Sequence, residues 1–322
     1  MPFKSICGHA VPLRMLKNIL ASERVPHAFM FSGIEGIGKK KAAVSFVKAL
    51  NCMEATDDFC DSCLSCSKIE RMIHPDVFVI EPDEKNIIKI DQVRFIQQEI
   101  VYKPLEGKKK VVIIDDAEKL NQQAANCLLK TLEEPADDTV IILIVQGSAG
   151  MLSTIVSRCQ KISFMPLGDA EMFRLLKEKG TEGEAAEKVV SHGQGSIKRA
   201  LFLLESDFLS KRAEVTQHLS RLSKGHFEAA FDIAKLIYDD PGRAALFEFL
   251  QTWYRDILFI KEGLSASLIC NPDLLEEMSL MAGSETMEGV LKKIKKLQWF
   301  NNNPATTVNI EMGLQSLFIQ GI

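Results

Sequence analysis

The sequence predicts an α/β domain built on a parallel sheet, followed by a wholly helical part. Up to about residue 165, short apolar runs typical of buried strands alternate with segments of helical periodicity. Beyond residue 166 only helical patterns follow. A glycine-rich turn after the first apolar run is typical of phosphate-binding loops. At 322 residues the chain is long enough for two or three domains.

The composition is that of an ordinary globular protein, with 46% hydrophobic and 25% charged residues. The formal net charge is −4, so any contact with nucleic acid requires a local basic surface. No apolar run approaches the roughly 20 residues that a membrane span needs. Residues 1–10 also lack the apolar core of a signal peptide. We therefore expect a cytoplasmic protein without a membrane partner.

The glycine-rich turn matches the P-loop pattern G-x-x-x-x-G-K-[S/T] at all but its last position. Gly33, Gly38 and Lys39 have the required spacing, and Gly36 lies between them. Backbone N–H groups can surround a phosphate only where no side chain blocks them, and the lysine reaches the outer phosphates. Lys40 stands where a Ser or Thr hydroxyl would bind Mg²⁺, and a second cation cannot replace that ligand. The motif alone leaves open whether this turn binds nucleotide or nothing.

The other elements of the α/β part follow from apolar patterns in chain order. Strands are expected where apolar residues run together: Ala28–Phe31, Val77–Ile80, Val111–Asp116, Val140–Val145 and Gln160–Phe164. Helices are expected where apolar residues recur at helical spacing: Val11–Ala21, Lys39–Leu50, Ile90–Ile100 with Asp91 as its N-cap, and Asn121–Leu132. Ligands bind at the carboxyl ends of parallel strands, so Gly33, Lys39, Asp115 and Gln146 should lie together.

Two acids close the strand expected over residues 111–116. After a P-loop, such a strand supplies the Walker B carboxylate that holds Mg²⁺ through water, here Asp115. The next residue is usually a glutamate that positions the attacking water, whereas Asp116 is one methylene shorter. A strand capped by solvated acids is the alternative interpretation.

Four of the eight cysteines lie within residues 52–66. Cys52, Cys60, Cys63 and Cys66 are separated by seven, two and two residues. In a reducing compartment, this spacing suits a closed tetrahedral Zn²⁺ site, which is structural and not catalytic. A metal-free thiol cluster and an iron–sulfur site are the alternatives.

Residues 169–206 predict two or three short helices, broken at Gly180 and around Gly193 and Gly195. Residues 208–322 are expected to be helical throughout. Two apolar faces there should form the core or pack on another subunit: Phe227, Phe231, Ile233, Leu236 and Ile237 on one, and Phe247, Leu250, Trp253, Tyr254 and Ile257 on the other.

With these motifs, the sequence resembles bacterial DNA polymerase III clamp-loader subunits of the AAA+ superfamily. Residues 126–135 are similar to the segment that follows Walker B, 157–159 match a Ser-Arg-Cys motif, and 52–66 match an inserted zinc module. The resemblance covers roughly residues 3–205. It implies a RecA-like AAA+ base at 1–165, a helical lid at 166–206 and an all-α collar for oligomerisation at 207–322.

The resemblance also implies roles for individual residues. Family members sense nucleotide with a polar residue after the fourth strand, here Gln146, and with a lid arginine where this chain has Lys198. Arg158 corresponds to the arginine finger, whose planar fork reaches the γ-phosphate in the neighbouring subunit. A surface ion pair is the alternative for Arg158. The changes at Lys40, Asp116 and Lys198 predict a subunit that helps its neighbour hydrolyse ATP and is not an ATPase itself.

The implied partners are the delta and tau/gamma subunits in a ring of five, with the sliding clamp and primed DNA reached through the complex. Structural Zn²⁺ is the expected cofactor, and binding of ATP with Mg²⁺ stays open. The first alternative is an ATP-hydrolysing motor subunit of the tau/gamma kind or another AAA+ DNA-remodelling ATPase, favoured by the retained Lys39 and Asp115. The second is a zinc-dependent nucleic-acid-binding module, favoured by the cysteines and Lys108–Lys110.

Overall fold

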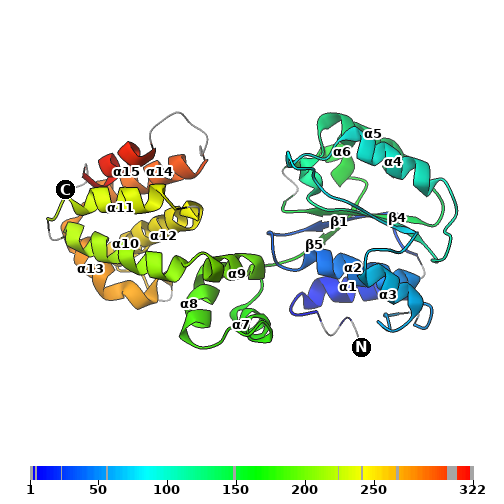
Figure 1. The fold of residues 1–322 in the computed structure, drawn as a ribbon, viewed down its shortest axis with the longest axis horizontal. Helices are drawn as coiled ribbons and strands as arrows, with labels where there is room; N and C mark the ends of the chain where they lie inside the picture. The colour runs from blue at the N-terminus through cyan, green and yellow to red at the C-terminus, as the bar shows by residue number, and fades with distance from the viewer. Residues whose placement is uncertain are drawn as a thin grey trace. The chain divides into compact units, whose positions relative to one another are not determined.

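The computed structural model describes residues 3, 6–22, 24–55, 57–147, 150–223, 225–240, 242–265, 268–302 and 310–319. The chain divides into two compact units. The first comprises Met1–Leu175 with Gly195–Lys198, and the second comprises Leu176–Gln194 with Arg199–Ile322. The strands all belong to the first unit, and the described elements of the second unit are helices (Figure 1).

A five-stranded sheet with the order β2-β3-β4-β1-β5 forms the centre of the first unit. Its strands are β1 (Ala28–Ser32), β2 (Val77–Ile80), β3 (Lys110–Ile114), β4 (Thr139–Val145) and β5 (Gln160–Ser163). Neighbouring strands pair in parallel throughout. β1, β3 and β4 are buried along their whole length, which agrees with their nearly continuous apolar sequences.

Helices cover both faces of this sheet (Figure 1). One face carries α1 (Ala10–Ala21), α2 (Lys39–Asn51) and α3 (Leu64–Glu70), and the other carries α4 (Ile90–Ile100), α5 (Gln122–Glu133) and α6 (Ser153–Val156). Alternate residues of β1 point to opposite faces. Phe29 and Phe31 therefore pack in the core under α2, while Ala28 and Met30 pack in the core under α4 and α5.

The strands and helices predicted for the first unit are confirmed. Several ends differ by one residue, as in β5, which ends at Ser163, and two further differences concern residues with a predicted role. β3 ends before Asp115, so Asp115 and Asp116 follow the strand and do not belong to it. Lys89, and not Asp91, is the N-cap of α4, because the Lys89 N–H donates to Gln92 Oε1 at 2.9 Å. Asp91 lies in the first turn of the helix.

The second unit begins within α7 (Asp169–Glu178), and the prediction of two or three short helices for residues 169–206 is confirmed, because the structure has three there. The following helices are α8 (Glu184–Gly193), α9 (Ile197–Glu205), α10 (Phe208–Ser223), α11 (Ala229–Tyr238), α12 (Arg243–Lys261), α13 (Leu275–Ser284), α14 (Met287–Asn302) and α15 (Ile310–Ile319). α12 packs against α13 and α14, and α10 packs against α11. None of the helices described is long and apolar enough to cross a membrane.

The two predicted apolar faces of the second unit have different outcomes. The α12 face is confirmed, since its five predicted residues are all buried. On the α11 face, Ile233 and Ile237 are buried in the core, whereas Phe227 and Phe231 are 48% and 50% exposed, so for these two the core is excluded and packing on another subunit stays a prediction. Phe227 precedes α11 and Phe231 lies on the outer side of that helix, so neither contributes to the core.

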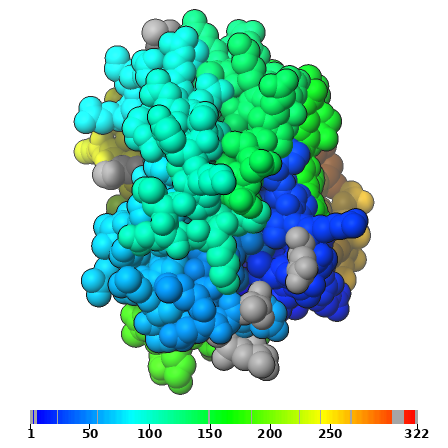
Figure 2. All heavy atoms as spheres, turned by 90° about the vertical axis from the view of Figure 1, so that its right-hand side faces the viewer, coloured from blue at the N-terminus to red at the C-terminus, as the bar shows by residue number. Residues whose placement is uncertain are grey.

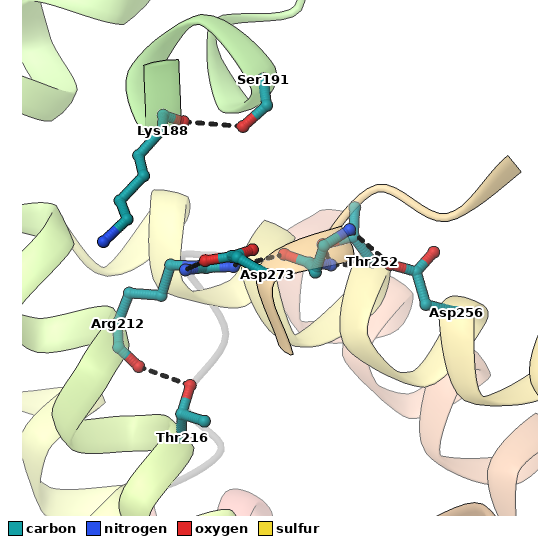
Figure 3. A network of polar contacts seen from close by, with 8 residues as sticks. Lys188, Ser191, Arg212, Thr216, Thr252, Asp256 and Asp273 are labelled. Atoms are coloured by element: carbon teal, nitrogen blue, oxygen red, sulfur yellow. Dashed lines mark hydrogen bonds and ion pairs between the residues drawn. The ribbon is translucent and has the colours of Figure 1, made fainter. Parts of the chain in front are cut away.

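A buried polar network ties α10 to the segment between α12 and α13 (Figure 3). The fully buried Asp256 accepts hydrogen bonds from the backbone N–H groups of Cys270 (3.0 Å) and Asn271 (2.9 Å). The Asn271 side chain accepts one from Arg212 at 3.1 Å, and Arg212 also binds Asp273 through two bonds of 2.7 and 2.8 Å. Because Arg212 is buried, this network gives its charge the partners that burial requires.

A second buried carboxylate, Asp76, holds a loop of the first unit. Its oxygens accept the backbone N–H groups of Leu105 (2.7 Å), Glu106 (2.8 Å) and Gly107 (2.8 Å). Burial alone would raise the pKa of Asp76, but these hydrogen bonds outweigh it and hold the pKa below the ordinary value. Asp76 therefore holds three consecutive N–H groups of the loop that precedes β3.

Replacing Asp76 by Ala should lower the free energy of unfolding of the first unit by about 3 kcal/mol, because three backbone N–H groups lose the buried carboxylate that accepts their hydrogen bonds. Urea denaturation followed by far-UV circular dichroism measures the change. Since the pKa is lower in the folded than in the unfolded state, the contribution is complete above the ordinary value of 3.8 and is lost as the pH falls through the folded pKa. Asp91→Ala, at a mostly exposed position, should change stability little. Equal losses in the two variants would contradict this role for Asp76.

Candidate functional site

The P-loop joins β1 to α2 in a conformation that requires two of its glycines. Gly36 and Gly38 have φ values of 77° and 98°, in the left-handed region that favours glycine. A Cβ atom on Gly36 would also lie 2.4 Å from the side chains of Ser196 and Lys198. Residues 195–198 therefore pack directly on the loop, within the first unit.

The ammonium group of Lys39 is held by the loop itself. Only 6% of this residue is exposed, and its Nζ donates to the carbonyl oxygens of Gly33 (2.5 Å) and Ile34 (2.8 Å). Burial lowers the pKa of Lys39, and nearby carboxylates, led by Glu118, only partly offset that effect. The P-loop lysine thus satisfies its hydrogen bonds within the chain.

Lys40 pairs with the residue predicted to be the Walker B carboxylate. Its Nζ lies 3.1 Å from Asp115 Oδ2 and also contacts the Glu81 carboxylate. Burial alone would lower the pKa of Lys40, but the hydrogen bonds to Glu81 and Asp115 raise it, so the side chain stays charged. No sequence motif predicts Glu81 as a site residue. Its position directly after β2, next to β3 in the sheet, is the signal that could have identified it.

The other predicted residues lie around the same edge of the sheet. Asp116 has a φ of 48°, and burial, together with the charge of Asp115, raises its pKa. Lys198 pairs with Glu35 of the P-loop. The backbone N–H of Gln146 donates to Glu118 Oε1 at 3.1 Å. The structure therefore brings the loop, the acids and Lys198 together, and it adds Glu35 and Glu118, which no sequence motif predicts.

The four clustered cysteines converge on a single point beside α2 and α3. Their sulfur atoms all lie within 4.8 Å of one another, and the Cys52 and Cys60 sulfurs are 3.7 Å apart. A tetrahedron with metal–sulfur bonds of about 2.3 Å has sulfur–sulfur edges of about 3.8 Å. The cluster could therefore hold a metal ion. Its segment (lighter blue in Figure 2) lies at the surface of the first unit, below the cyan residues.

Backbone hydrogen bonds favour thiolates in this cluster. The N–H groups of Ala55, Cys63 and Cys66 donate to the sulfurs of Cys52 (3.3 Å), Cys60 (3.2 Å) and Cys63 (3.4 Å). Burial alone would raise the pKa of Cys63, but such bonds outweigh it and lower the pKa to about 7. Burial raises the pKa of Cys66. Thiolates are the form in which cysteine binds a metal ion, so the donors fit such an ion.

Arg158 lies at the surface between α6 and β5. Its guanidinium pairs with Glu133 Oε1 at 2.8 Å and donates to the carbonyl oxygen of Thr154 at 3.0 Å. Its side chain is 36% exposed. Within this chain, Arg158 therefore forms a surface ion pair, and both of its partners lie outside the P-loop site.

A parallel sheet in this strand order, with a P-loop after β1, an acid after β3 and a helical C-terminal part, defines an AAA+ type of P-loop protein. The family model described as "DNA polymerase III, delta subunit" matches residues 8–168. A second model, for the C-terminal part of the DNA polymerase III delta subunit, matches residues 206–321. The chain belongs to the DNA polymerase III delta subunit family.

Two relatives that are delta' subunits agree with this assignment. DNA polymerase III subunit delta' of Bacillus subtilis is 30% identical over 95% of this chain and 94% of its own length. Subunit delta' of Pseudomonas aeruginosa is 36% identical over 63% of each chain. Among solved structures, a DNA polymerase III gamma subunit-related protein of Thermotoga maritima is 20% identical, with a TM-score of 0.49 over 95% of this chain and 97% of that one.

Proposed function

We propose that this chain works as the delta-prime subunit of a bacterial clamp loader. The observation that carries the proposal is the similarity to a delta' subunit over nearly the whole length of both chains. The chain has a base at 1–165, a lid at 166–206 and a collar at 207–322. It joins delta and tau/gamma subunits in a ring of five in the cytoplasm, which places the sliding clamp on primed DNA.

The chain's own nucleotide site does not hydrolyse ATP. Lys40 supplies a cation in place of the hydroxyl that binds Mg²⁺, and this cation pairs with Asp115. Asp116 is one methylene shorter than the water-positioning glutamate that it would have to replace. Each change removes one electrostatic contribution to catalysis, commonly worth a factor of about 10²–10³ in rate.

Arg158 acts on the ATP of the neighbouring subunit. Its partial exposure, and the position of Glu133 as its one ion-pair partner in the described part of the chain, leave the guanidinium able to change partners. An arginine is suited to this exchange because its fixed fork binds phosphate oxygens in two places at once. The chain thereby contributes to hydrolysis of the ATP that the neighbouring subunit binds.

The cysteine cluster holds a structural Zn²⁺ ion. Four sulfur donors leave no open position for water or substrate, so the site is closed and not catalytic. The acidic residues around the cysteine cluster do not favour binding of DNA, whose phosphates are also negatively charged. Asp58 and Asp61 beside the cluster pair with Lys17 and Lys48, so these lysines are already neutralised. A role in fixing the segment between α2 and α3 fits these observations better than nucleic-acid binding.

The isolated chain should show no ATP turnover above background, because it retains neither the Mg²⁺ hydroxyl nor the catalytic glutamate. Phosphate release in Mg²⁺ and ATP measures this directly. Lys39→Ala serves as the control and should give the same background. Turnover by the wild type that disappears in Lys39→Ala would contradict the proposal and favour the ATP-hydrolysing motor subunit.

A further inference from the structure

Lys40 occupies the place that a metal ion takes in a working P-loop site. Such an ion lies between the first turn of the P-loop helix and the acid after the Walker B strand. Here the first turn of α2 supplies an ammonium group, 3.1 Å from the carboxylate of Asp115 and in contact with that of Glu81. Mg²⁺ requires oxygen ligands at about 2.0–2.1 Å in octahedral geometry, and an ammonium group has no lone pair to offer. The residues present therefore do not fit Mg²⁺.

The charges around the loop lead to the same conclusion for nucleotide. Three cations face the site: Lys39, Lys40 and Lys198. Five acids surround them: Glu35, Glu81, Asp115, Asp116 and Glu118. Without a divalent ion, the net charge of these eight groups is negative, so the site repels a polyphosphate. Each cation is also already bound, Lys39 by loop carbonyls, Lys40 by Asp115 and Glu81, and Lys198 by Glu35.

We propose that Lys40 is a built-in substitute for Mg²⁺, whose ammonium neutralises Asp115 and Glu81 and keeps the P-loop site formed without metal and without nucleotide. This inference rests on the proposed function, because it explains how a subunit that does not hydrolyse ATP keeps its base domain ordered. The cation is covalently attached, so the order of this site does not depend on the nucleotide state of the cell.

The test compares Mg²⁺ binding by the full-length wild type and Lys40→Thr, using isothermal titration calorimetry and thermal unfolding with and without added Mg²⁺, in a buffer free of chelator so that the cysteine cluster keeps its metal. Lys40→Thr removes the ammonium, leaves the two carboxylates unpaired and restores the hydroxyl that P-loops use. It should bind Mg²⁺ roughly tenfold or more tightly than the wild type. Its unfolding temperature should be lower than that of the wild type without Mg²⁺ and should rise when Mg²⁺ is added, whereas the unfolding temperature of the wild type should not respond to Mg²⁺.

The matched control is Lys41→Thr. Lys41 is the next residue in α2, is exposed and forms no ion pair with any residue that the structure describes. The control makes the same change of charge without touching Asp115 or Glu81, so it should behave like the wild type. Lys40→Arg keeps a cation at the site and should also exclude Mg²⁺.

Two results would overturn the inference: wild type that binds Mg²⁺ as tightly as Lys40→Thr, or an equal gain in Lys41→Thr. If Lys40→Thr is unfolded without Mg²⁺, recovery of its fold with Mg²⁺ supports the inference. If the fold does not recover, Mg²⁺ binding is compared between the wild type and Lys40→Met instead. Wild type that binds Mg²⁺ as tightly as Lys40→Met, or an equal gain in Lys41→Thr, would then count against the inference. ATPase and assembly of a loader reconstituted with the wild-type chain test the proposed function separately, so the two can fail independently.

Discussion

A clamp loader reconstituted with Arg158→Ala should assemble normally but lose ATP hydrolysis at the site next to this subunit. An arginine finger is commonly worth a factor of about 10³ or more in turnover, so that site should become nearly inactive. The guanidinium lies at the surface, and removing its pair with Glu133 should cost little stability. Steady-state phosphate release in the presence of clamp and primed DNA measures the loss.

Glu133→Gln separates the two interpretations of Arg158. If Arg158 acts only through its ion pair inside the chain, breaking the pair from the other side should reproduce the loss. If Arg158 acts on the neighbour's ATP, Glu133→Gln should keep full activity, because it frees the guanidinium. Arg94→Ala, at another exposed arginine, controls for general loss of surface charge. An assembled loader with unchanged ATPase in Arg158→Ala would show that no trans contact exists.

Replacing Cys63 by Ser should release the metal and destabilise the segment between α2 and α3. Cys63 contributes one of the four sulfurs, and its sulfur also accepts the Cys66 N–H as the N-cap of α3. Zinc binding contributes on the order of 10 kcal/mol to comparable small sites, so the loss should amount to several kcal/mol locally. Metal analysis after gel filtration and hydrogen exchange over residues 52–70 measure both effects.

Cys127→Ser is the matched control for this experiment. Cys127 lies in α5 and donates to Gln97 Oε1 at 3.1 Å, a contact that a serine can also make. This variant should keep stoichiometric zinc and wild-type exchange in residues 52–70. Full zinc content in Cys63→Ser would mean that Cys63 is not a ligand.

The sheet and its helices could be predicted because their signals are local. β3 and β4 are runs of β-branched and apolar residues with both faces buried, and no other element needs to be known to recognise them. α3 could not be predicted in the same way. It has seven residues, and its N-cap is the sulfur of Cys63, whereas N-caps are usually recognised by Ser, Thr, Asp or Asn. The cysteine spacing therefore predicts the metal-binding cluster but gives no indication of α3.

The candidate site was predictable wherever a motif specifies it and not where its residues meet only in three dimensions. Gly33, Lys39 and Asp115 follow from spacing and from their positions after strands. Glu81 pairs with Lys40 only because β2 lies beside β3 in the sheet. This arrangement brings Glu81 close to Asp115, although the two are far apart in the sequence. The exposure of Phe231 likewise depends on which side of α11 faces the core, and helical spacing alone does not fix that side.

The measurement that tests the account most directly compares two loaders, one containing Lys39→Ala and the other containing Arg158→Ala. Lys39 belongs to the chain's own P-loop, whereas Arg158 is assigned to the neighbour's ATP. The account predicts wild-type ATPase with Lys39→Ala and a strong loss with Arg158→Ala. A loss with Lys39→Ala, together with normal activity in Arg158→Ala, would mean that this chain hydrolyses its own ATP and would contradict the account.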